Sequence, residues 1–389
     1  MRATVWHGVG DIRLDDVPVP RLQDPSDAIV RLTASAICGT DLHFVRGSMS
    51  GMRPGTILGH EGVGIVEQTG EDVRNLDPGD RVVIASTIAC GSCAYCRAGY
   101  FAQCLVANPH GPEAGTAFFG GPEATGPFDG LQAELARIPF ANVGLVKLPD
   151  EVEDDDALLI SDIFPTAWFG ARLAEVTPGD VVAVFGCGPV GLLTIVSAQL
   201  QGAGRVLAVD QHADRLAQAR ALGAETVDFS NEHPVETLRR LTGGTGPDRV
   251  IDAVGIDAES PGARTARPEP ADEDAGFQPP GNAPDQALRW EVDAVAKAGT
   301  VAIIGVYPPD AETFPIGAAM NKNLTLQMGN CNHRRYIPEL VELVRAGVVR
   351  PSRLVTQVEE LQDAVSAYSS FDARSPGWQK VALDPAGVR

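Results

Sequence analysis

Residues 181–200 read VVAVFGCGPVGLLTIVSAQL, and this stretch decides the fold class. Val181–Phe185 is a short β-branched run, typical of a strand buried on both faces, whereas Pro189–Gln201 has the pattern of a helix with proline in its first turn. The stretch contains no charged residue as far as Gly204, which is long enough to span a membrane. Because glycines and a change of period interrupt it, we interpret it as one strand–turn–helix unit and expect no membrane partner.

Strand-like and helix-like segments alternate from residue 178 onwards. This alternation predicts an α/β fold with a doubly wound parallel sheet and helices on both of its faces. The predicted strands are Val181–Phe185, Val206–Asp210, Thr226–Phe229, Val250–Val254 and Val301–Val306. The predicted helices are Pro189–Leu200, Ala213–Leu222, Pro234–Leu241 and Pro284–Lys297.

The rest of the chain has a different pattern. Residues 1–150 contain short β runs separated by glycine and proline, which predicts a mostly antiparallel, barrel-like domain. The chain from about Asn321 returns to mixed strand and helix and is expected to close back on that first domain. Residues 256–284 are rich in proline, alanine and acidic residues and cannot form a core alone. This insertion follows the carboxyl end of a parallel strand, so a lid over a ligand and a plain surface insertion both remain open.

The turn Gly186–Gly191 has the G-x-G-x-x-G pattern between a predicted strand and a predicted helix. Its first glycine permits the tight turn, its second lets a pyrophosphate approach the backbone, and its third lets helix and strand pack closely. Asp210 lies 24 residues after Gly186, at the end of the next strand, where a carboxylate binds the ribose 2′-hydroxyl and repels a 2′-phosphate. NAD is therefore favoured over NADP. The predicted cofactor-binding residues of this unit are Gly186, Gly188, Pro189, Val190, Gly191, Asp210 and Arg215.

Four of the seven cysteines have the spacing C-x2-C-x2-C-x7-C: Cys90, Cys93, Cys96 and Cys104. This spacing lets four thiolates converge on one ion and favours a structural zinc site. Disulfides are disfavoured because the number of cysteines is odd and the chain has the features of a cytoplasmic protein. An iron–sulfur cluster, and with it an electron carrier, is the remaining alternative, although its fourth cysteine usually follows after three residues.

A second group of metal-binding residue types lies upstream. Cys38 precedes Asp41 and His43 closely, and His60 is followed by Glu61. Thiolate, imidazole and carboxylate are the ligands that zinc accepts.

Taken together, these motifs resemble the zinc-dependent medium-chain alcohol dehydrogenases over nearly the whole chain. The resemblance rests on Cys38–His43, on Gly59–Gly62 with Gly64, on the four cysteines, on the glycine-rich turn with Asp210, and on Asp252–Gly255. It implies a GroES-like β-rich catalytic domain (1–162) with a structural zinc lobe at about 88–106. It also implies a Rossmann coenzyme domain (163–320) that carries the insertion, and a C-terminal part (321–389) that returns to the catalytic domain.

The resemblance also implies which residues hold the catalytic zinc. Cys38 and His60 match two ligands, and Asp162 stands where many members have cysteine. That difference and the long insertion are similar to the subgroup of glutathione-independent formaldehyde dehydrogenase and formaldehyde dismutase. Glu61 is expected either to ligate zinc transiently or to be structural.

The implied activity is hydride transfer between a small-molecule alcohol or aldehyde and NAD, with two zinc ions per chain. Thr40 is placed to pass the alcohol proton towards His43, Asp41 is expected to fix the ring of His60, and Lys380 is expected to contact the pyrophosphate. The alternative is an aldehyde dismutase that retains NAD tightly, since both activities need the same residues. Phe118, Phe119 and Phe128 are the bulky groups of the Gly111–Gly130 loop, which suggests small or moderately sized apolar substrates.

Charge and composition limit the partners. The formal net charge is −20, so an anionic nucleic acid or membrane surface would be repelled. The charged residues near the N-terminus leave no apolar segment of a signal peptide, which predicts a cytoplasmic protein. The resemblance alone implies a homo-oligomer, either a tetramer or a dimer.

Overall fold

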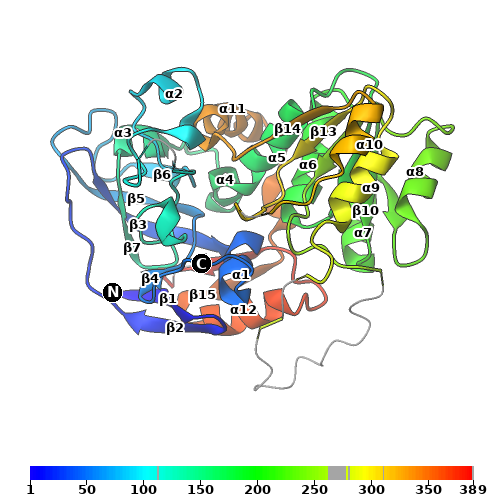
Figure 1. Cartoon of the computed structure of the whole chain (residues 1–389). Helices are drawn as coiled ribbons and strands as arrows, with labels where there is room; N and C mark the ends of the chain where they lie inside the picture. The colour runs from blue at the N-terminus through cyan, green and yellow to red at the C-terminus, as the bar shows by residue number, and fades with distance from the viewer. Residues whose placement is uncertain (112–113, 262–276, 279–280, 310, 388–389) are drawn as a thin grey trace. The chain divides into compact units, whose positions relative to one another are not determined.

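The computed structural model describes residues 1–111, 114–261, 277–278, 281–309 and 311–387. The chain divides into two compact units (Figure 1). Unit 1 contains residues 1–165, 277–278 and 331–387, and unit 2 contains residues 166–261 and 281–330. Within the described residues, no helix is long and apolar enough to cross a membrane.

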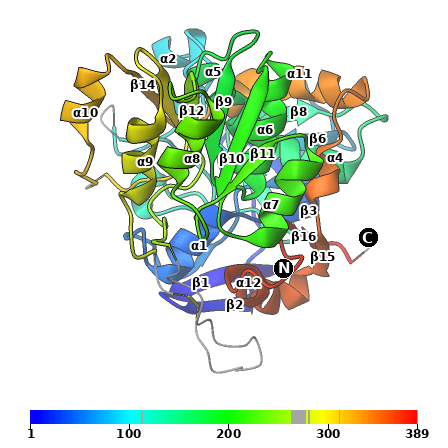
Figure 2. The same ribbon diagram turned by 90° about the vertical axis from the view of Figure 1, so that its right-hand side faces the viewer.

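Unit 2 is built on a six-stranded parallel sheet with the order β11-β10-β9-β12-β13-β14 (Figure 2). Its central strands are apolar on both faces: Val184 pairs with Ala208 on one side and with Ile251 on the other, and all three are fully buried. The strands are β9 (Val181–Phe185), β10 (Arg205–Asp210), β11 (Glu225–Asp228), β12 (Arg249–Asp252), β13 (Thr300–Ile303) and β14 (Thr325–Met328).

Helices cover both faces of this sheet because parallel crossovers are right-handed. The chain moves outward from β9 to β11 and then returns to β12 and continues outward in the opposite direction, so the helices after β9 and β10 lie on one face and the later ones on the other. The contacts between α6 and α7, and between α8 and α9, agree with this division. The helices are α5 (Ile163–Leu173), which leads into the unit, α6 (Pro189–Leu200), α7 (Ala213–Ala221), α8 (Pro234–Leu241), α9 (Gln286–Ala294) and α10 (Ile316–Asn321).

The strand order reverses between β9 and β12, and the carboxyl ends of these two strands form the position where doubly wound sheets bind ligands. The predicted α/β sheet is therefore confirmed. The strand predicted at Val250–Val254 ends earlier, at Asp252, because the Asp252 carboxylate accepts the N–H groups of Val254 and Gly255 and turns the chain.

The predicted domain boundary at residue 320 stays a prediction. Thr325–Met328 forms β14, which pairs in parallel register with β13 in the sheet of unit 2. This strand is short and partly exposed, so its sequence has little of the apolar continuity that marks the central strands. The expectation of a lid at 256–284 falls mainly on residues 262–276 and 279–280, which lie outside the described part of the chain.

Unit 1 is rich in antiparallel sheet, as the sequence predicts. Its long central strand β3 (Ala28–Ile37) pairs with β5, β7 and β16, and a smaller sheet has the order β2-β1-β4. Gly64 permits the close approach of β5 to β3, since a Cβ there would lie 2.3 Å from the carbonyl oxygen of Arg31. The other strands are β1 (Arg2–Gly8), β2 (Asp11–Asp16), β4 (Thr56–Ile57), β5 (Gly62–Thr69), β6 (Arg81–Ile84), β7 (Leu135–Ile138), β8 (Leu145–Lys147), β15 (Gln357–Glu360) and β16 (Val381–Asp384).

Short helices surround these sheets (Figure 1). Helix α4 packs over β3, β5 and β6, and α11 packs against α4. The α-helices of unit 1 are α1 (Gly39–Arg46), α2 (Ala94–Arg97), α3 (Ala141–Gly144), α4 (Asp154–Ser161), α11 (His333–Arg345) and α12 (Ala364–Asp372). Its 3₁₀ turns are η1 (Phe101–Gln103), η2 (Glu123–Thr125), η3 (Pro351–Leu354) and η4 (Leu361–Asp363).

Candidate metal centres and cofactor turn

The four cysteines of the predicted structural site converge, with all four sulfur atoms within 4.8 Å of one another. The sulfur atoms of Cys93 and Cys104 are 4.0 Å apart. Zinc–sulfur bonds of about 2.3 Å in a tetrahedron place neighbouring sulfur atoms roughly 3.8 Å apart. The arrangement therefore fits one zinc ion.

Backbone N–H groups point at these sulfur atoms. Cys90 Sγ accepts the N–H groups of Ser92 and Cys93, and Cys104 Sγ accepts that of Val106, each at 3.4 Å. Burial raises the pKa of Cys93, but N–H donors, first that of Cys96, outweigh it and lower the pKa to about 6. Such donors stabilise the thiolate, which is the form that binds metal.

A second cluster brings Cys38, His60, Glu61 and Asp162 together, again with their ligand atoms within 4.8 Å. Cys38 Sγ lies 3.9 Å from Asp162 Oδ2, and His60 Nε2 lies 3.3 Å from the same oxygen. Ligand atoms around a tetrahedral zinc ion lie about 3.3–3.8 Å apart. His60 lies 22 residues after Cys38, and Asp162 lies 102 residues after His60, so only the fold brings these ligands together.

Local structure explains how each ligand reaches this point. Cys38 directly follows the long strand β3 and caps helix α1, where the Asp41 carboxylate accepts the Cys38 N–H at 2.9 Å. His60 and Glu61 directly precede β5, and Asp162 terminates α4. The ends of β3 and α4 and the start of β5 therefore meet at one place in unit 1.

Asp41 has the predicted orienting position. Its Oδ1 lies 3.2 Å from His60 Nδ1, which leaves the Nε2 side of the ring towards Asp162. The Gln132 amide lies 3.4 Å from the other Asp41 oxygen, and Tyr368 donates to the Gln132 carbonyl oxygen at 3.0 Å. No sequence motif indicates Gln132 or Tyr368, since both are distant from Asp41 along the chain.

His333 is a further member that sequence reasoning missed. Its Nε2 lies 2.6 Å from Asp162 Oδ1, and its Nδ1 lies 3.1 Å from Thr87 Oγ1. A single histidine in the segment Asn330–Arg335 carries no motif, and its partner Asp162 is 171 residues away. Only the fold reveals the pairing.

The electrostatics of the cluster favour an ionised Asp162. Burial raises the pKa of Asp162, but hydrogen bonds from His333 and His60 outweigh it and hold the pKa well below its ordinary value. Burial lowers the pKa of His60, whereas Asp41 and Asp162 raise it, and the net effect is a pKa well above the usual one. A bound metal ion takes the place of that proton.

The Lys380 side chain is fully buried, and its Nζ donates to Glu61 Oε1 at 2.5 Å and to the Ile37 carbonyl oxygen at 3.1 Å. Its predicted contact with a pyrophosphate stays a prediction. Burial lowers the pKa of Lys380, but the Glu61 carboxylate outweighs it and raises the pKa. Lys380 therefore neutralises the charge of Glu61 beside the metal cluster.

Thr40 and His43 lie three residues apart in helix α1, so they share one face of it. Thr40 is half-buried and His43 is buried. Their predicted part in proton transfer stays a prediction. Of the three phenylalanines singled out in the sequence, Phe118 lies against His60, with ring centroids 6.1 Å apart, whereas Phe119 belongs to the core.

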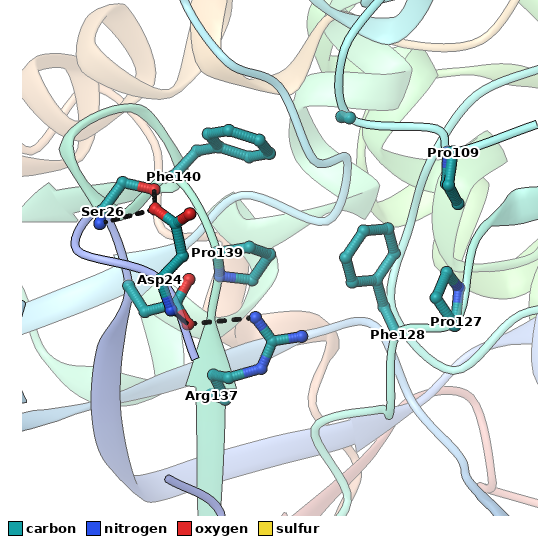
Figure 3. Close-up of a pocket in the computed structure, with 10 residues that line it drawn as sticks. Asp24, Ser26, Pro109, Pro127, Phe128, Arg137, Pro139 and Phe140 are labelled. Carbon is teal, nitrogen blue, oxygen red and sulfur yellow. Dashed lines mark hydrogen bonds and ion pairs between the residues drawn. The ribbon is translucent and has the colours of Figure 1, made fainter. Parts of the chain in front are cut away.

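Phe128 lines a separate cavity of about 260 Å³ in unit 1 (Figure 3). Arg137 enters this cavity and bonds the buried carboxylate of Asp27 at 3.1 Å, while Phe128 and Phe140 contribute apolar walls. None of its lining residues belongs to either metal cluster. The cavity is therefore distinct from the candidate active site.

In unit 2 the glycine-rich turn has the predicted geometry. Gly186 adopts φ +87°, and a Cβ on Gly191 would lie 1.8 Å from the Gly186 carbonyl oxygen, so both positions require glycine. Gly188 precedes α6, with Pro189 and Val190 at the first helical positions. A Cβ on Gly188 would meet only Arg215 Nη1, at 3.9 Å, which leaves the backbone there accessible to a ligand.

Asp210 lies at the end of β10, beside this turn. Its Oδ2 accepts the N–H of Cys187 at 2.8 Å and lies 4.0 Å from Arg215 Nη1, and its Oδ1 accepts the N–H groups of Gln211 and His212. Burial raises the pKa of Asp210, but Arg215 and His212 outweigh it and lower the pKa. The structure thus brings Asp210 and Arg215 together at the predicted turn, and their contacts with a cofactor stay a prediction.

Two family models match the chain: the alcohol dehydrogenase GroES-like domain over residues 24–150 and the zinc-binding dehydrogenase over residues 189–265. An uncharacterized zinc-type alcohol dehydrogenase-like protein of Bacillus subtilis is 37% identical, over 99% of this chain and 100% of its own length. A glutathione-independent formaldehyde dehydrogenase of Pseudomonas aeruginosa is 31% identical, over 99% and 97% of the two chains.

Solved structures agree. The alcohol dehydrogenase TADH from Thermus sp. ATN1 has a TM-score of 0.84 and 36% identity, with 99% of each chain covered. These similarities support a zinc-dependent dehydrogenase rather than an iron–sulfur electron carrier. The chain therefore belongs to the zinc-type medium-chain alcohol dehydrogenase family, and it is an oxidoreductase whose cofactors are zinc and NAD.

Proposed function

We propose that this dehydrogenase interconverts small alcohols and aldehydes at a zinc ion held by Cys38, His60 and Asp162. The observation that carries the proposal is the convergence of three ligand types on one point, with Asp162 Oδ2 3.3 Å from His60 Nε2 and 3.9 Å from Cys38 Sγ. Three protein ligands leave a tetrahedral ion one position for substrate, as in catalytic rather than structural zinc sites. The four-cysteine lobe is the structural site.

A zinc ion held by Cys38, His60 and Asp162 would supply a Lewis acid for the substrate oxygen, and bound NAD would supply the hydride chemistry. The chain's own residues orient the reactants and move the proton. Thr40, two residues beyond Cys38, accepts the alcohol proton through its hydroxyl group, and His43 on the same face of α1 carries it onward. Asp41 holds the His60 ring so that Nε2 faces the ligand cluster.

The cofactor preference follows from Asp210. The carboxylate is buried, and N–H groups of Cys187, Gln211 and His212 keep it ionised. A fixed negative charge at the end of the second strand binds ribose hydroxyl groups and repels a 2′-phosphate. NAD is therefore the proposed cofactor of this chain, bound over the turn that contains Gly188.

The substrate is proposed to be a small primary alcohol or its aldehyde. Phe118 packs edge-on against His60 and also stacks on Phe44, with ring centroids 6.3 Å apart, so aromatic rings lie on one side of His60. The similarity to a formaldehyde dehydrogenase supports a small aldehyde. Zinc in such a setting favours a short substrate with one oxygen.

The decisive experiment is a panel of primary alcohols and aldehydes, assayed for the absorbance change of NADH, together with zinc analysis of purified protein. We expect two zinc ions per chain and turnover of the short members. Asp162→Ala should retain one zinc ion and lose activity, whereas Asp150→Asn, an exposed carboxylate on a loop, should change neither. Full activity in Asp162→Ala would refute the ligand assignment.

The same panel separates dehydrogenation from the dismutase alternative. Aldehyde mixed with the enzyme without added NAD gives equal amounts of alcohol and acid only if a retained cofactor cycles within the protein. A dehydrogenase that releases NADH gives no such products. We expect the second result.

The chain is also proposed to form a homo-oligomer, either a dimer or a tetramer. Strand β14 lies at the end of the parallel sheet, and Met328 on it is 60% exposed. Ile316 and Met320, four residues apart on α10, are also exposed. Apolar side chains beside a sheet edge are typical of a surface that another chain covers.

A cytoplasmic location is proposed on the state of the cysteines. None of the seven forms a disulfide: five belong to the two metal clusters, and Cys187 and Cys331 are buried. Cysteines without disulfides are typical of a reducing compartment. The net charge of −20 supports the absence of a nucleic-acid partner.

A further inference from the structure

His333 and the residue before it connect the two metal centres of unit 1. His333 Nε2 lies 2.6 Å from Asp162 Oδ1, while the other Asp162 oxygen faces His60 and Cys38. The two oxygens of Asp162 therefore have separate partners. A hydrogen bond to Oδ1 fixes the carboxylate plane and with it the direction of Oδ2.

The ring of His333 is itself held from the other side. A carboxylate only accepts hydrogen bonds, so Nε2 is the donor to Asp162, and in the neutral ring Nδ1 then accepts from the Thr87 hydroxyl at 3.1 Å. All three side chains are buried or nearly so. Thr87 lies three residues before Cys90, the first cysteine of the zinc lobe.

The neighbouring residue reaches the far end of the same lobe. The side-chain oxygen of Asn332 accepts the N–H of Ala102 at 2.9 Å, and Asn332 is 5% exposed. Ala102 lies in turn η1, two residues before Cys104, and helix α11 packs against this turn. Cys104 in turn accepts the N–H of Cys90 through its sulfur, at 3.3 Å.

We propose that Asn332 and His333, at the start of α11, act as positioning residues that couple the four-cysteine lobe to the catalytic metal site. Asn332 bonds Ala102 and His333 bonds Thr87, so these two consecutive residues contact both ends of the lobe. His333 also orients Asp162. An ordered lobe therefore keeps the Asp162 carboxylate in the orientation that binds the ion, whereas a disordered lobe would allow the carboxylate to rotate away. This coupling rests on the proposed role of Asp162 as a zinc ligand.

The first experiment measures zinc release from the holoenzyme into excess chromogenic chelator. Asp162→Ala, which keeps only the lobe ion, identifies the phase of the structural zinc. His333→Gln places an amide nitrogen near the position of Nε2, and His333→Asn places one near Nδ1. We expect catalytic zinc to leave His333→Asn about 10–100 times faster than wild type, and His333→Gln to stay within about threefold of wild type.

The second experiment tests the coupling itself. Asn332→Ala keeps all metal ligands and His333, yet it should accelerate catalytic zinc release several-fold, whereas Asn332→Asp, which keeps an acceptor for Ala102, should resemble wild type. The matched control is Asn142→Ala, because Asn142 also accepts a backbone N–H, that of Arg74, but in another loop. It should leave both phases unchanged.

The outcomes separate this inference from the proposed function. If the wild type releases only one zinc ion, the catalytic site assignment fails. If it releases two, and His333→Asn and His333→Gln release them at the same rate, His333 does not position Asp162. If Asn332→Ala changes the structural phase alone, the two centres are independent and the coupling is refuted.

Discussion

Lys380 and Glu61 form an ion pair from which water is excluded, with both side chains fully buried and the charged atoms 2.5 Å apart. Removal of two charges from water is expensive, and their attraction offsets it only while both are present. Glu61 Oε2 has no hydrogen-bond partner in the described structure, although it lies in the group of metal-ligating residues. Lys380 therefore fixes Glu61 through Oε1, whereas the position of Oε2 depends on the neighbouring metal-ligating residues.

Lys380→Met should destabilise the folded chain by about 3–5 kcal/mol, because it leaves the buried Glu61 carboxylate without its counter-ion. The measurement is urea-induced unfolding followed by circular dichroism. Lys147→Met is the matched control: Lys147 pairs with Asp80 at the same 2.5 Å, but its side chain is 60% exposed. That change should leave the free energy of unfolding close to that of wild type, because solvent screens an exposed ion pair.

The double variant Lys380→Met with Glu61→Gln removes both charges and should recover much of the loss. Equal destabilisation in Lys380→Met and Lys147→Met would show that burial of the first pair has no energetic consequence.

At the scale of elements, the glycine-rich turn joins β9 to α6 with two different requirements. Gly191 is needed for packing, since a Cβ there would overlap the Gly186 carbonyl oxygen. Gly188 is needed for access, since a Cβ there would meet only Arg215 Nη1, at 3.9 Å, and φ −68° suits any residue. Folding and cofactor binding therefore depend on different glycines of one motif.

Gly191→Ala should lower the free energy of unfolding by about 1–3 kcal/mol, the usual effect of overpacking. Gly188→Ala should leave stability equal or slightly higher, by up to about 1 kcal/mol, and should weaken NAD binding about tenfold or more because the methyl group occupies the path of the pyrophosphate. Thermal unfolding and titration calorimetry with NAD measure the two effects. Unchanged NAD affinity in Gly188→Ala would place the pyrophosphate elsewhere.

Asp180 fixes the start of β9 to β12. Its Oδ2 accepts the Thr177 N–H and the Arg249 Nε at 2.9 Å each. Burial raises the pKa of Asp180, but the hydrogen bond from Arg249 and those from Thr177 outweigh it, and the pKa is lowered. A lowered pKa in the folded state gives a stabilisation that is present above the unfolded pKa of about 3.9 and is lost as the pH falls through the folded value.

Asp180→Asn should therefore cost about 1–3 kcal/mol near pH 7, and the difference from wild type should shrink below about pH 4. Urea unfolding across this pH range gives the difference directly. Asp285→Asn serves as the control, because Asp285 pairs with Arg289 on the exposed face of one helix turn. Its effect should stay below about 0.5 kcal/mol, and a pH-independent loss in Asp180→Asn would contradict the linkage.

Across the whole molecule, sequence reasoning succeeds where the signal is local. The glycine-rich turn with its strand and helix, and the four cysteines within fifteen residues, are each set by contacts close along the chain. Partners far apart leave no such pattern: His333 meets Asp162 across 171 residues, and Lys380 meets Glu61 across 319. The sequence therefore indicates neither the ion pair of Lys380 with Glu61 nor the contact of His333 with Asp162.

The exposed apolar residues of unit 2 give a test of assembly. Met328 is 60% exposed at the edge of the sheet. Met328→Arg adds a charge there and should shift the sedimentation coefficient towards that of a smaller species. Val348→Arg is the control, since Val348 is 53% exposed and lies after α11, in unit 1. An unchanged sedimentation coefficient in Met328→Arg would exclude this edge as the contact.

The two metal clusters differ in the length of chain that each requires. The four cysteines are complete once residue 104 has been synthesised, whereas Asp162 meets His333, which lies 171 residues further along the chain. During translation, the lobe is therefore able to capture its ion while most of the protein is still unmade. Since the contact that orients Asp162 forms only after His333 has been synthesised, we expect the lobe to hold its ion firmly before the catalytic site does.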